Sequence, residues 1–184
     1  MNSIIKDWSD LIRRVIAKDR IAQAQFIEDT QKDLFQFCFY LTHNRQFAED
    51  LLHDTYLKGF ESLASLKNSN SLLSWLKQIA RFLYLDYVKS AAFRNEVQSD
   101  TDLELAIDES ADKKNKQIDV LKILGKLDEA DRTVLILIDI QGCDYEETAS
   151  ILQVPVGTVK SRLFRAREKF SSFYNGTKRR TSSS

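Results

Sequence analysis

Apolar residues recur every three or four positions along most of the chain, the spacing that gives an α-helix one hydrophobic face. From residue 9 to residue 92 this pattern predicts consecutive amphipathic helices. The apolar positions of the earlier helices are Leu11, Ile12, Val15, Ile16, Leu34, Phe35, Cys38, Phe39, Leu41, Phe47, Leu51, Leu52, Tyr56, Phe60 and Leu63. Residues 64–71 interrupt the pattern with Asn and Ser, so we predict a loop there. A last helix is predicted over roughly 72–90, with its apolar stripe on Leu72, Trp75, Leu76, Ile79, Leu83 and Tyr87.

The pattern resumes after residue 117 and predicts helices over 118–127 and 129–140. Asp128 is placed to cap the second of these, and Gly142 to end it. Asp144, with Glu147 three residues later, has the spacing of a capping box and opens the next helix. Pro155 fits the first turn of a final helix that we expect from Val156 to about Phe173. Its inward face is predicted to carry Val159, Leu163, Phe164, Ala166 and Phe170.

Composition agrees with an all-α protein, because five Gly and one Pro in 184 residues are too few for the many turns of a β-sandwich or barrel. Residues 96–112 carry seven acidic groups, no basic group and no aromatic residue, which is typical of a linker that cannot bury itself. We therefore expect two small helical domains, over 1–92 and 118–175. An acidic flexible linker at 93–117 would join them, and a polar tail would follow at 176–184.

The formal net charge is zero, with 27 basic and 27 acidic side chains, but the charges are unevenly placed. Residues 156–184 hold eight basic groups and one acidic group, whereas residues 96–119 hold three basic and eight acidic groups. A basic segment of this kind attracts an anionic polymer, and an acidic segment repels it. A solvated terminal helix with a basic tail is the alternative on charge alone.

Residues 144–170 have the form of a helix-turn-helix, in which a short helix with a small residue at the crossing, Ala149, precedes a longer basic helix. Such a second helix can enter the major groove, where Arg and Lys bind phosphates or guanine edges and Thr and Ser reach bases or backbone. An ordinary helical hairpin with a basic face is the alternative. The polar faces of the second helix carry Thr158, Lys160, Ser161, Arg162, Arg165, Arg167 and Lys169.

Two further features concern the first half of the chain. Glu49, Asp50, His53 and Asp54 fall on one side of a helix and form an exposed acidic patch, which either docks a basic protein surface or is only a solvated face. The helix over 72–90 mixes cations with rings, as single-strand binding requires. Phe82 and Tyr84 lie off its apolar stripe and are its better candidates for such contacts. Trp75 and Tyr87 lie on the stripe, so we expect them in the core.

No spacing of residues supports catalysis or a cofactor. His43 and His53 lack the spacing of a zinc site, and no phosphate-binding or nucleophile motif is present. Cys38 and Cys143 are too few for a disulfide framework and are expected to be buried thiols. The start of the chain lacks a signal-peptide core, and no apolar run approaches 18 residues, so we expect a cytoplasmic protein without membrane insertion.

Three stretches resemble the bacterial sigma factors of the extracytoplasmic function (ECF) group, which keep only regions two and four: AEDLLHDTYLKGFESL (48–63), SWLKQIARFLYLDYVK (74–89) and a stretch ending in PVGTVKSRLFRARE (155–168). The resemblance covers roughly residues 10–92 and 118–174. It implies a factor that binds core RNA polymerase and directs it to promoter DNA, without catalysis or cofactors. An anti-sigma factor is left open as a further partner.

The resemblance also implies a role for each matching position. Glu49, Asp50, His53 and Asp54 match the region that docks on core polymerase. The loop 64–71, with Asn68 and Asn70, matches the loop that takes a flipped base of the minus-ten element, and Lys77, Arg81, Phe82 and Lys89 would line the melted strand. The residues that match the helix entering the minus-thirty-five element are Thr158, Lys160, Ser161, Arg162, Phe164 and Arg165.

Four positions depart from the usual pattern of that group. His53 replaces a Gln, Ile138 replaces a basic residue, and Cys143 replaces a larger aliphatic residue. Gln153 stands where the turn often has Gly, and therefore requires positive φ or a different turn.

The residues alone leave two alternatives, a stand-alone helix-turn-helix repressor or activator and a helical enzyme that uses Cys or His. Binding to core polymerase separates the first from a sigma factor, and mutation of both His residues tests the second.

Overall fold

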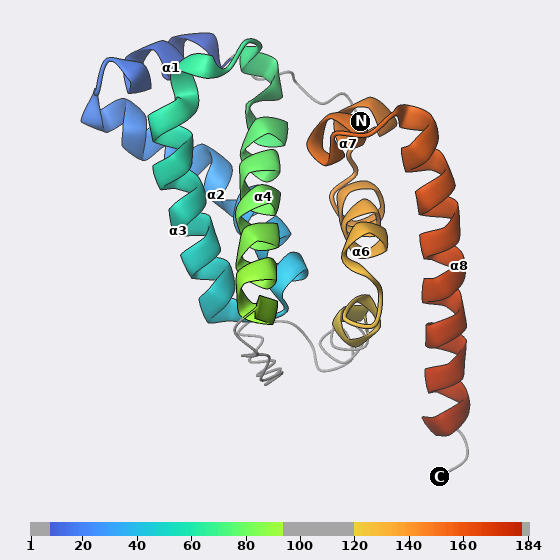
Figure 1. The fold of residues 1–184 in the computed structure, drawn as a ribbon. Coiled ribbons are helices and arrows are strands. Elements are labelled where there is room, and N and C mark those ends of the chain that lie inside the picture. The colour runs from blue at the N-terminus through green and yellow to red at the C-terminus, as the bar shows by residue number, and fades with distance from the viewer. Residues whose placement is uncertain (1–7, 94–119, 182–184) are drawn as a thin grey trace. The chain divides into compact units, whose positions relative to one another are not determined.

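The computed structural model describes residues 8–93 and 120–181, and within these ranges every regular element is a helix (Figure 1). The chain divides into two compact units, one made of residues 1–38 and 46–98 and the other of residues 39–45 and 99–184. The expectation of an all-α fold is confirmed. The acidic stretch 96–112 lies outside the described residues.

Four α-helices and two 3₁₀ turns make up the described sequence from residue 8 to residue 93. In chain order they are α1 (Ser9–Ile16), α2 (Arg20–Thr42), α3 (Arg45–Ser62), η1 (Leu63–Ser65), η2 (Ser69–Ser71) and α4 (Leu72–Phe93). Figure 1 shows α3 and α4 side by side, joined at one end by the loop that contains η1 and η2. The loop predicted at 64–71 is therefore present, with two short 3₁₀ turns inside it.

The first unit has a core of aromatic and aliphatic side chains in which α3 and α4 pack closely. Phe26 of α2 is fully buried, and its ring lies 5.4 Å from that of Phe60 and 6.3 Å from that of Tyr56, between ring centroids. The Tyr56 hydroxyl shares a buried 2.8 Å hydrogen bond with Thr30 Oγ1, so this polar atom has a partner. A Cβ added at Gly59 would stand 3.1 Å from a methyl group of Leu76, which shows how closely the two helices approach.

The buried face of α4 differs from the predicted stripe. Leu72, Leu76, Ala80 and Tyr84 are buried at intervals of four residues, whereas Tyr87 is 55% exposed. The placement of Tyr87 in the core was therefore wrong, and so was the choice of Tyr84 as a surface residue. Apolar residues spaced four apart and apolar residues spaced three apart can each form one face of a helix. The direction from which α2 and α3 approach α4 decides which of the two faces is buried.

The described part of the second unit consists of a helical turn at residues 120–124, α6 (Glu129–Leu135), the π-helical turn η3 (Ile136–Ile140), α7 (Tyr145–Leu152) and α8 (Val156–Thr181). Asp128 caps α6 as predicted, its carboxylate accepting a 2.9 Å hydrogen bond from the Asp131 N–H. Gly142 has φ of +70° and ends the helical run, also as predicted. Helix α8 continues eight residues past its predicted end at Phe173, because no Pro follows and Gly176 alone costs a helix only about 1 kcal/mol.

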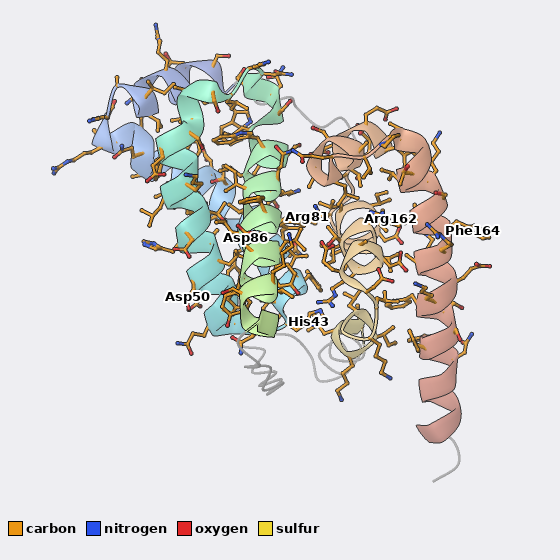
Figure 2. All side chains as sticks on the ribbon, in the orientation of Figure 1. His43, Asp50, Arg81, Asp86, Arg162 and Phe164 are labelled. Atoms are coloured by element: carbon orange, nitrogen blue, oxygen red, sulfur yellow. The ribbon has the colours of Figure 1, made fainter. Side chains whose placement is uncertain are left out.

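The inward face of α8 holds the second unit together. Val159, Leu163 and Ala166 are 0–2% exposed and pack within this unit, as predicted. Phe164, predicted on the same face, is instead 65% exposed and points away from the rest of its unit (Figure 2). Its position follows from helical geometry, since each residue advances about 100° and Phe164 therefore lies well over 90° from Val159 and Ala166.

Candidate nucleic-acid interface

Helices α7 and α8 form the predicted helix-turn-helix. The Asp144 carboxylate caps α7 through a 2.7 Å hydrogen bond from the Glu147 N–H, in agreement with the capping signal. Ala149 is buried at 8% exposure, as a small residue at a helix crossing must be. Thr148 beside it is fully buried, and its hydroxyl has no hydrogen-bond partner. Helix α7 packs against α8, and this contact limits the face that α8 presents to solvent.

The turn between these helices is a Schellman motif centred on Gln153. Gln153 has φ of 55° and ψ of 46°, the left-handed region that glycine usually occupies. Its N–H donates to the Ser150 carbonyl at 3.3 Å, and the Val154 N–H donates to the Ala149 carbonyl at 3.1 Å. The departure at position 153 therefore leaves the turn geometry intact, and the left-handed conformation carries its usual energetic cost for a residue with a Cβ.

One outward face of α8 gathers most of the residues that the sequence assigns to the minus-thirty-five element. These are Thr158, Lys160, Ser161, Phe164 and Arg165. Arg162, two residues before Phe164, lies about 160° away around the helix and is half-buried. The outward face therefore combines two cations, two hydroxyl groups and one exposed ring, and Arg162 stands at its edge.

The cations of α8 fall into two classes, which the sequence did not distinguish. The Arg167 guanidinium makes a two-point contact with the Asp139 carboxylate, at 3.0 Å and 2.5 Å, and Asp139 raises the pKa of Arg167. Lys169 bridges Asp128, at 2.9 Å, and Asp131, and both carboxylates raise the pKa of the Lys169 amine. Among the described residues no acidic side chain pairs with Lys160, Arg162 or Arg165.

Lys160 has a neighbour that sequence analysis missed. Its ammonium lies 5.4 Å from the centre of the Tyr145 ring, a cation–π distance, and Tyr145 is 38% exposed at the start of α7. The two residues are fifteen apart in sequence, so only the crossing of α7 and α8 brings them together. A cation held over a ring loses less conformational freedom when it binds an anion, which suits a DNA contact.

In the first unit, the residues predicted to receive melted DNA lie in the loop 64–71, which contains η2, and along α4. Asn68 and Asn70 are exposed at the loop, where the Asn68 side-chain oxygen accepts a 3.0 Å hydrogen bond from the Asn70 N–H. Among the described residues, no other hydrogen bond occupies the side-chain NH₂ of Asn68 or the side-chain amide of Asn70. Both amides can therefore offer donors and acceptors to a base edge.

The α4 residues predicted to line the melted strand do not share one face. Phe82, 63% exposed, and Lys89 are seven residues apart and lie on the same side of the helix. Arg81 is half-buried and lies about 100° from Phe82, and Lys77 is buried at 4% exposure. The structure therefore presents Phe82 and Lys89 together, whereas Lys77 is not on the surface with them.

The acidic patch of the first unit is exposed as expected. Glu49, Asp50, His53 and Asp54 all lie on the solvent side of α3, while Leu51 is buried at 3% exposure. Leu57, one turn further along α3, is 52% exposed and adds an apolar side chain beside the acids. Sequence analysis missed Leu57, although its spacing from Asp50 and Asp54 places it on the same face.

Two family models match the two halves of the chain: "Sigma-70 region 2" covers residues 26–94, and "Sigma-70, region 4" covers residues 117–170. The chain is 32% identical over 140 residues to the ECF RNA polymerase sigma factor EcfG of Rhodopseudomonas palustris, an alignment that covers 74% of this chain and 76% of that one. The chain belongs to the ECF sigma factors.

Further comparisons agree with this assignment. The ECF RNA polymerase sigma factor SigM of Bacillus subtilis is 28% identical over 148 residues, which covers 78% of this chain and 89% of SigM. A solved structure of the sigma factor RpoE in complex with the anti-sigma factor NepR, from Bartonella quintana, has a TM-score of 0.69 at 27% identity. That likeness covers 83% of this chain and 96% of RpoE. A structure of CnrH with the cytosolic domain of CnrY shares the fold, with a TM-score of 0.72.

As an ECF sigma factor, the protein binds core RNA polymerase and directs it to promoters for transcription initiation, and it is not an enzyme. The alternatives of a stand-alone repressor and of a helical enzyme are therefore set aside. No helix in the described ranges has the length and apolar character needed to cross a membrane.

Proposed function

We propose that this sigma factor reads the minus-thirty-five element with the outward face of α8. The division of the α8 cations carries the proposal: acidic residues of the same unit hold Arg167 and Lys169, whereas Lys160 and Arg165 stand on the exposed face without an acidic partner among the described residues. Lys160 and Arg165 can bind phosphates or guanine edges, and Phe164 beside them can contact thymine methyl groups. Arg162, at the edge of the face, is assigned a phosphate contact.

The test compares Lys160→Ala and Arg165→Ala with Arg167→Ala, a matched loss of one cation from the same helix. Holoenzyme binding to promoter DNA is measured over a range of salt concentrations. Each lost phosphate contact should reduce the slope of log affinity against log salt by about 0.9, whereas Arg167→Ala should leave the slope unchanged. An equal reduction by Arg167→Ala would overturn the assignment, and unchanged core binding by all three variants is the control.

The loop 64–71 is proposed to take a flipped base of the minus-ten element, with Phe82 and Lys89 of α4 along the melted strand. The exposed side chains of Asn68 and Asn70 support this role, because a flipped base is read by hydrogen bonds to its edge. Arg81 would contact the strand from the side of α4, and we withdraw Lys77 from the contact set because it is buried. Asn68→Ala and Asn70→Ala should each weaken sequence preference within the minus-ten element, measured by transcription from a library randomised there.

The acidic patch on α3 is proposed to dock on core polymerase. Four exposed polar or acidic side chains and the exposed Leu57 support a protein contact, since interfaces combine an apolar centre with a charged rim. Asp50→Arg and Asp54→Arg should weaken core binding at least tenfold through charge reversal. Glu28→Arg, which reverses an exposed charge on α2, should not. Similar losses from all three would indicate general charge repulsion and contradict a specific patch.

We also propose that the protein acts in the cytoplasm and that an anti-sigma factor regulates it. The support for the second point is the likeness to RpoE, whose structure is a complex with the anti-sigma factor NepR. Such a partner would compete with core polymerase. Titrating a candidate anti-sigma factor into the holoenzyme should release free sigma factor, and simultaneous binding of both would contradict competition.

A further inference from the structure

Helix α1 packs against the loop that is proposed to receive the flipped base, although α1 lies outside the residues 26–94 that the region 2 model matches. It touches both 3₁₀ turns, η1 and η2. Trp8, Ile12 and Val15 are 4–9% exposed and form the inward stripe of α1. Helix α1 thus has a buried side and lies against the loop, and is not a solvated extension of the chain.

One hydrogen bond joins α1 directly to the loop. The hydroxyl groups of Ser9, at the start of α1, and Ser69, at the start of η2, are 2.8 Å apart. Ser69 lies between Asn68 and Asn70, the two residues proposed to read the base. A constraint on Ser69 is therefore a constraint on the backbone that carries both amides.

Residues 64–71 of the loop are exposed or half-buried. Its ends are fixed by Leu63 and Leu72, which are 1% and 0% exposed. Between them the Leu66 N–H donates to the Leu63 carbonyl at 3.1 Å, the Ser71 N–H donates to the Asn68 carbonyl at 3.0 Å, and the Asn70 N–H donates to the Asn68 side chain at 3.0 Å. A short solvent-exposed loop samples several conformations unless a neighbouring element holds it.

We propose that α1 is a positioning element for minus-ten recognition: by holding Ser69 it fixes the loop conformation in which Asn68 and Asn70 meet the flipped base. The inference rests on the proposed function of the loop. Preorganisation of this kind strengthens discrimination between bases, because a loop that is already ordered does not lose conformational freedom when the correct base binds. A purely structural α1 would change the stability of the unit and leave base preference unaltered.

The first test removes the contact and measures base preference separately from stability. Ser9→Ala, Ser69→Ala and the double variant are assembled with core polymerase and transcribed on a library randomised across the minus-ten element. Each single variant should lower the preference for the best base about two- to fivefold, the effect of one exposed hydrogen bond. The double variant should lose no more than either single variant, because both remove the same bond.

The second test restores the contact by another bond. Ile12→Ala loosens α1, and Ser9→Cys with Ser69→Cys allows a disulfide to tie α1 to the loop under oxidised glutathione. Oxidation should restore the base preference that Ile12→Ala loses, and reduction should abolish the rescue. Cys38 and Cys143 are buried and should not compete. Thermal unfolding followed by tryptophan fluorescence checks that each variant is folded at the assay temperature.

The outcomes distinguish a failure of the proposed function of the loop from a failure of the proposed positioning role of α1. If Asn68→Ala and Asn70→Ala leave base preference unchanged, the proposed function of the loop is wrong. If those variants lose preference while Ser69→Ala and Ile12→Ala keep it, α1 is only structural and the inference is overturned. Failure of the cysteine pair to form a disulfide would also overturn it, because the two hydroxyl groups would then not be neighbours in solution.

Discussion

Replacement of Gln153 by Gly should stabilise the helix-turn-helix, although it removes a side chain from a DNA-binding unit. Gln153 adopts φ of 55° in the turn and is exposed, and among the described residues its side chain makes no hydrogen bond. A residue with a Cβ costs about 1–2 kcal/mol in this conformation. Glycine avoids that cost but gives up about 0.5–1 kcal/mol through the greater freedom of the unfolded chain. The net gain is about 0.5–1 kcal/mol, or roughly 2–8 °C in Tm for a unit of this size.

The two units can be followed separately in the full chain. Both tryptophans, Trp8 and Trp75, belong to the first unit, so their fluorescence follows that unit, while far-UV circular dichroism follows helices in both. Gln153→Gly should therefore raise a circular dichroism transition and leave the tryptophan transition in place. Lys18 has φ of 62° between α1 and α2, and Lys18→Gly should raise the tryptophan transition together with the circular dichroism transition of the first unit.

Gln153→Ala is the matched control, because alanine keeps the Cβ and should change Tm little. The reasoning is refuted if Gln153→Gly destabilises the protein or behaves like Gln153→Ala. Since the Schellman hydrogen bonds come from the backbone, promoter selectivity should be the same in the glycine variant and the parent protein.

Three further predictions concern the second unit. Partial burial raises the pKa of Asp128, but hydrogen bonds from Lys169 and the Asp131 N–H outweigh it and hold the pKa at about 2, below the ordinary 3.8. The stabilisation is therefore complete above about pH 5 and is lost as the pH falls toward 2; since the side chain is 57% exposed, it amounts to less than about 1 kcal/mol. Asp128→Asn, which keeps the cap, should flatten this part of a stability–pH profile, and an unchanged profile would contradict the pairing. Thr148→Val should raise stability by about 1 kcal/mol in urea unfolding, because it replaces a buried hydroxyl without a partner; a loss would indicate an unseen hydrogen bond. Tyr145→Leu should weaken promoter binding about two- to fivefold and Tyr145→Phe should not, since only the ring holds Lys160; equal losses would assign the effect to the hydroxyl.

Local signals in the sequence predicted the elements of this protein well, because those signals act over a few residues. Asp128 and Asp144 cap helices where their side chains were expected to, and Gly142 takes the left-handed conformation that ends a helical run. The exposed acidic patch on α3 was also predicted, since its residues and the buried Leu51 alternate at helical spacing. The end of α8 was not predicted, because no strong stop signal follows Phe173.

Predictions that depended on packing direction succeeded less often. On α4 the choice between Tyr84 and Tyr87 for the core was wrong, because both fit an apolar stripe and the approach of the other helices selects one. The resemblance placed Lys77 along the melted strand, whereas its side chain is buried at 4% exposure. The π-helical turn at Ile136–Ile140 gave no signal in the sequence, since it has the same apolar pattern as an ordinary helix.

By itself the sequence determined that this protein is helical, that its excess of positive charge is concentrated in residues 156–184, and that its motifs resemble those of an ECF sigma factor. Helical periodicity, capping residues and the charge of each segment are local properties, so they can be read from the order of residues. Only the tertiary structure decided which cations of α8 are available to DNA, because Asp128, Asp131 and Asp139 meet Lys169 and Arg167 from 28 to 41 residues away. It also brought Ser9 to Ser69 across 60 residues. Such pairings depend on how helices cross, and no local pattern specifies that.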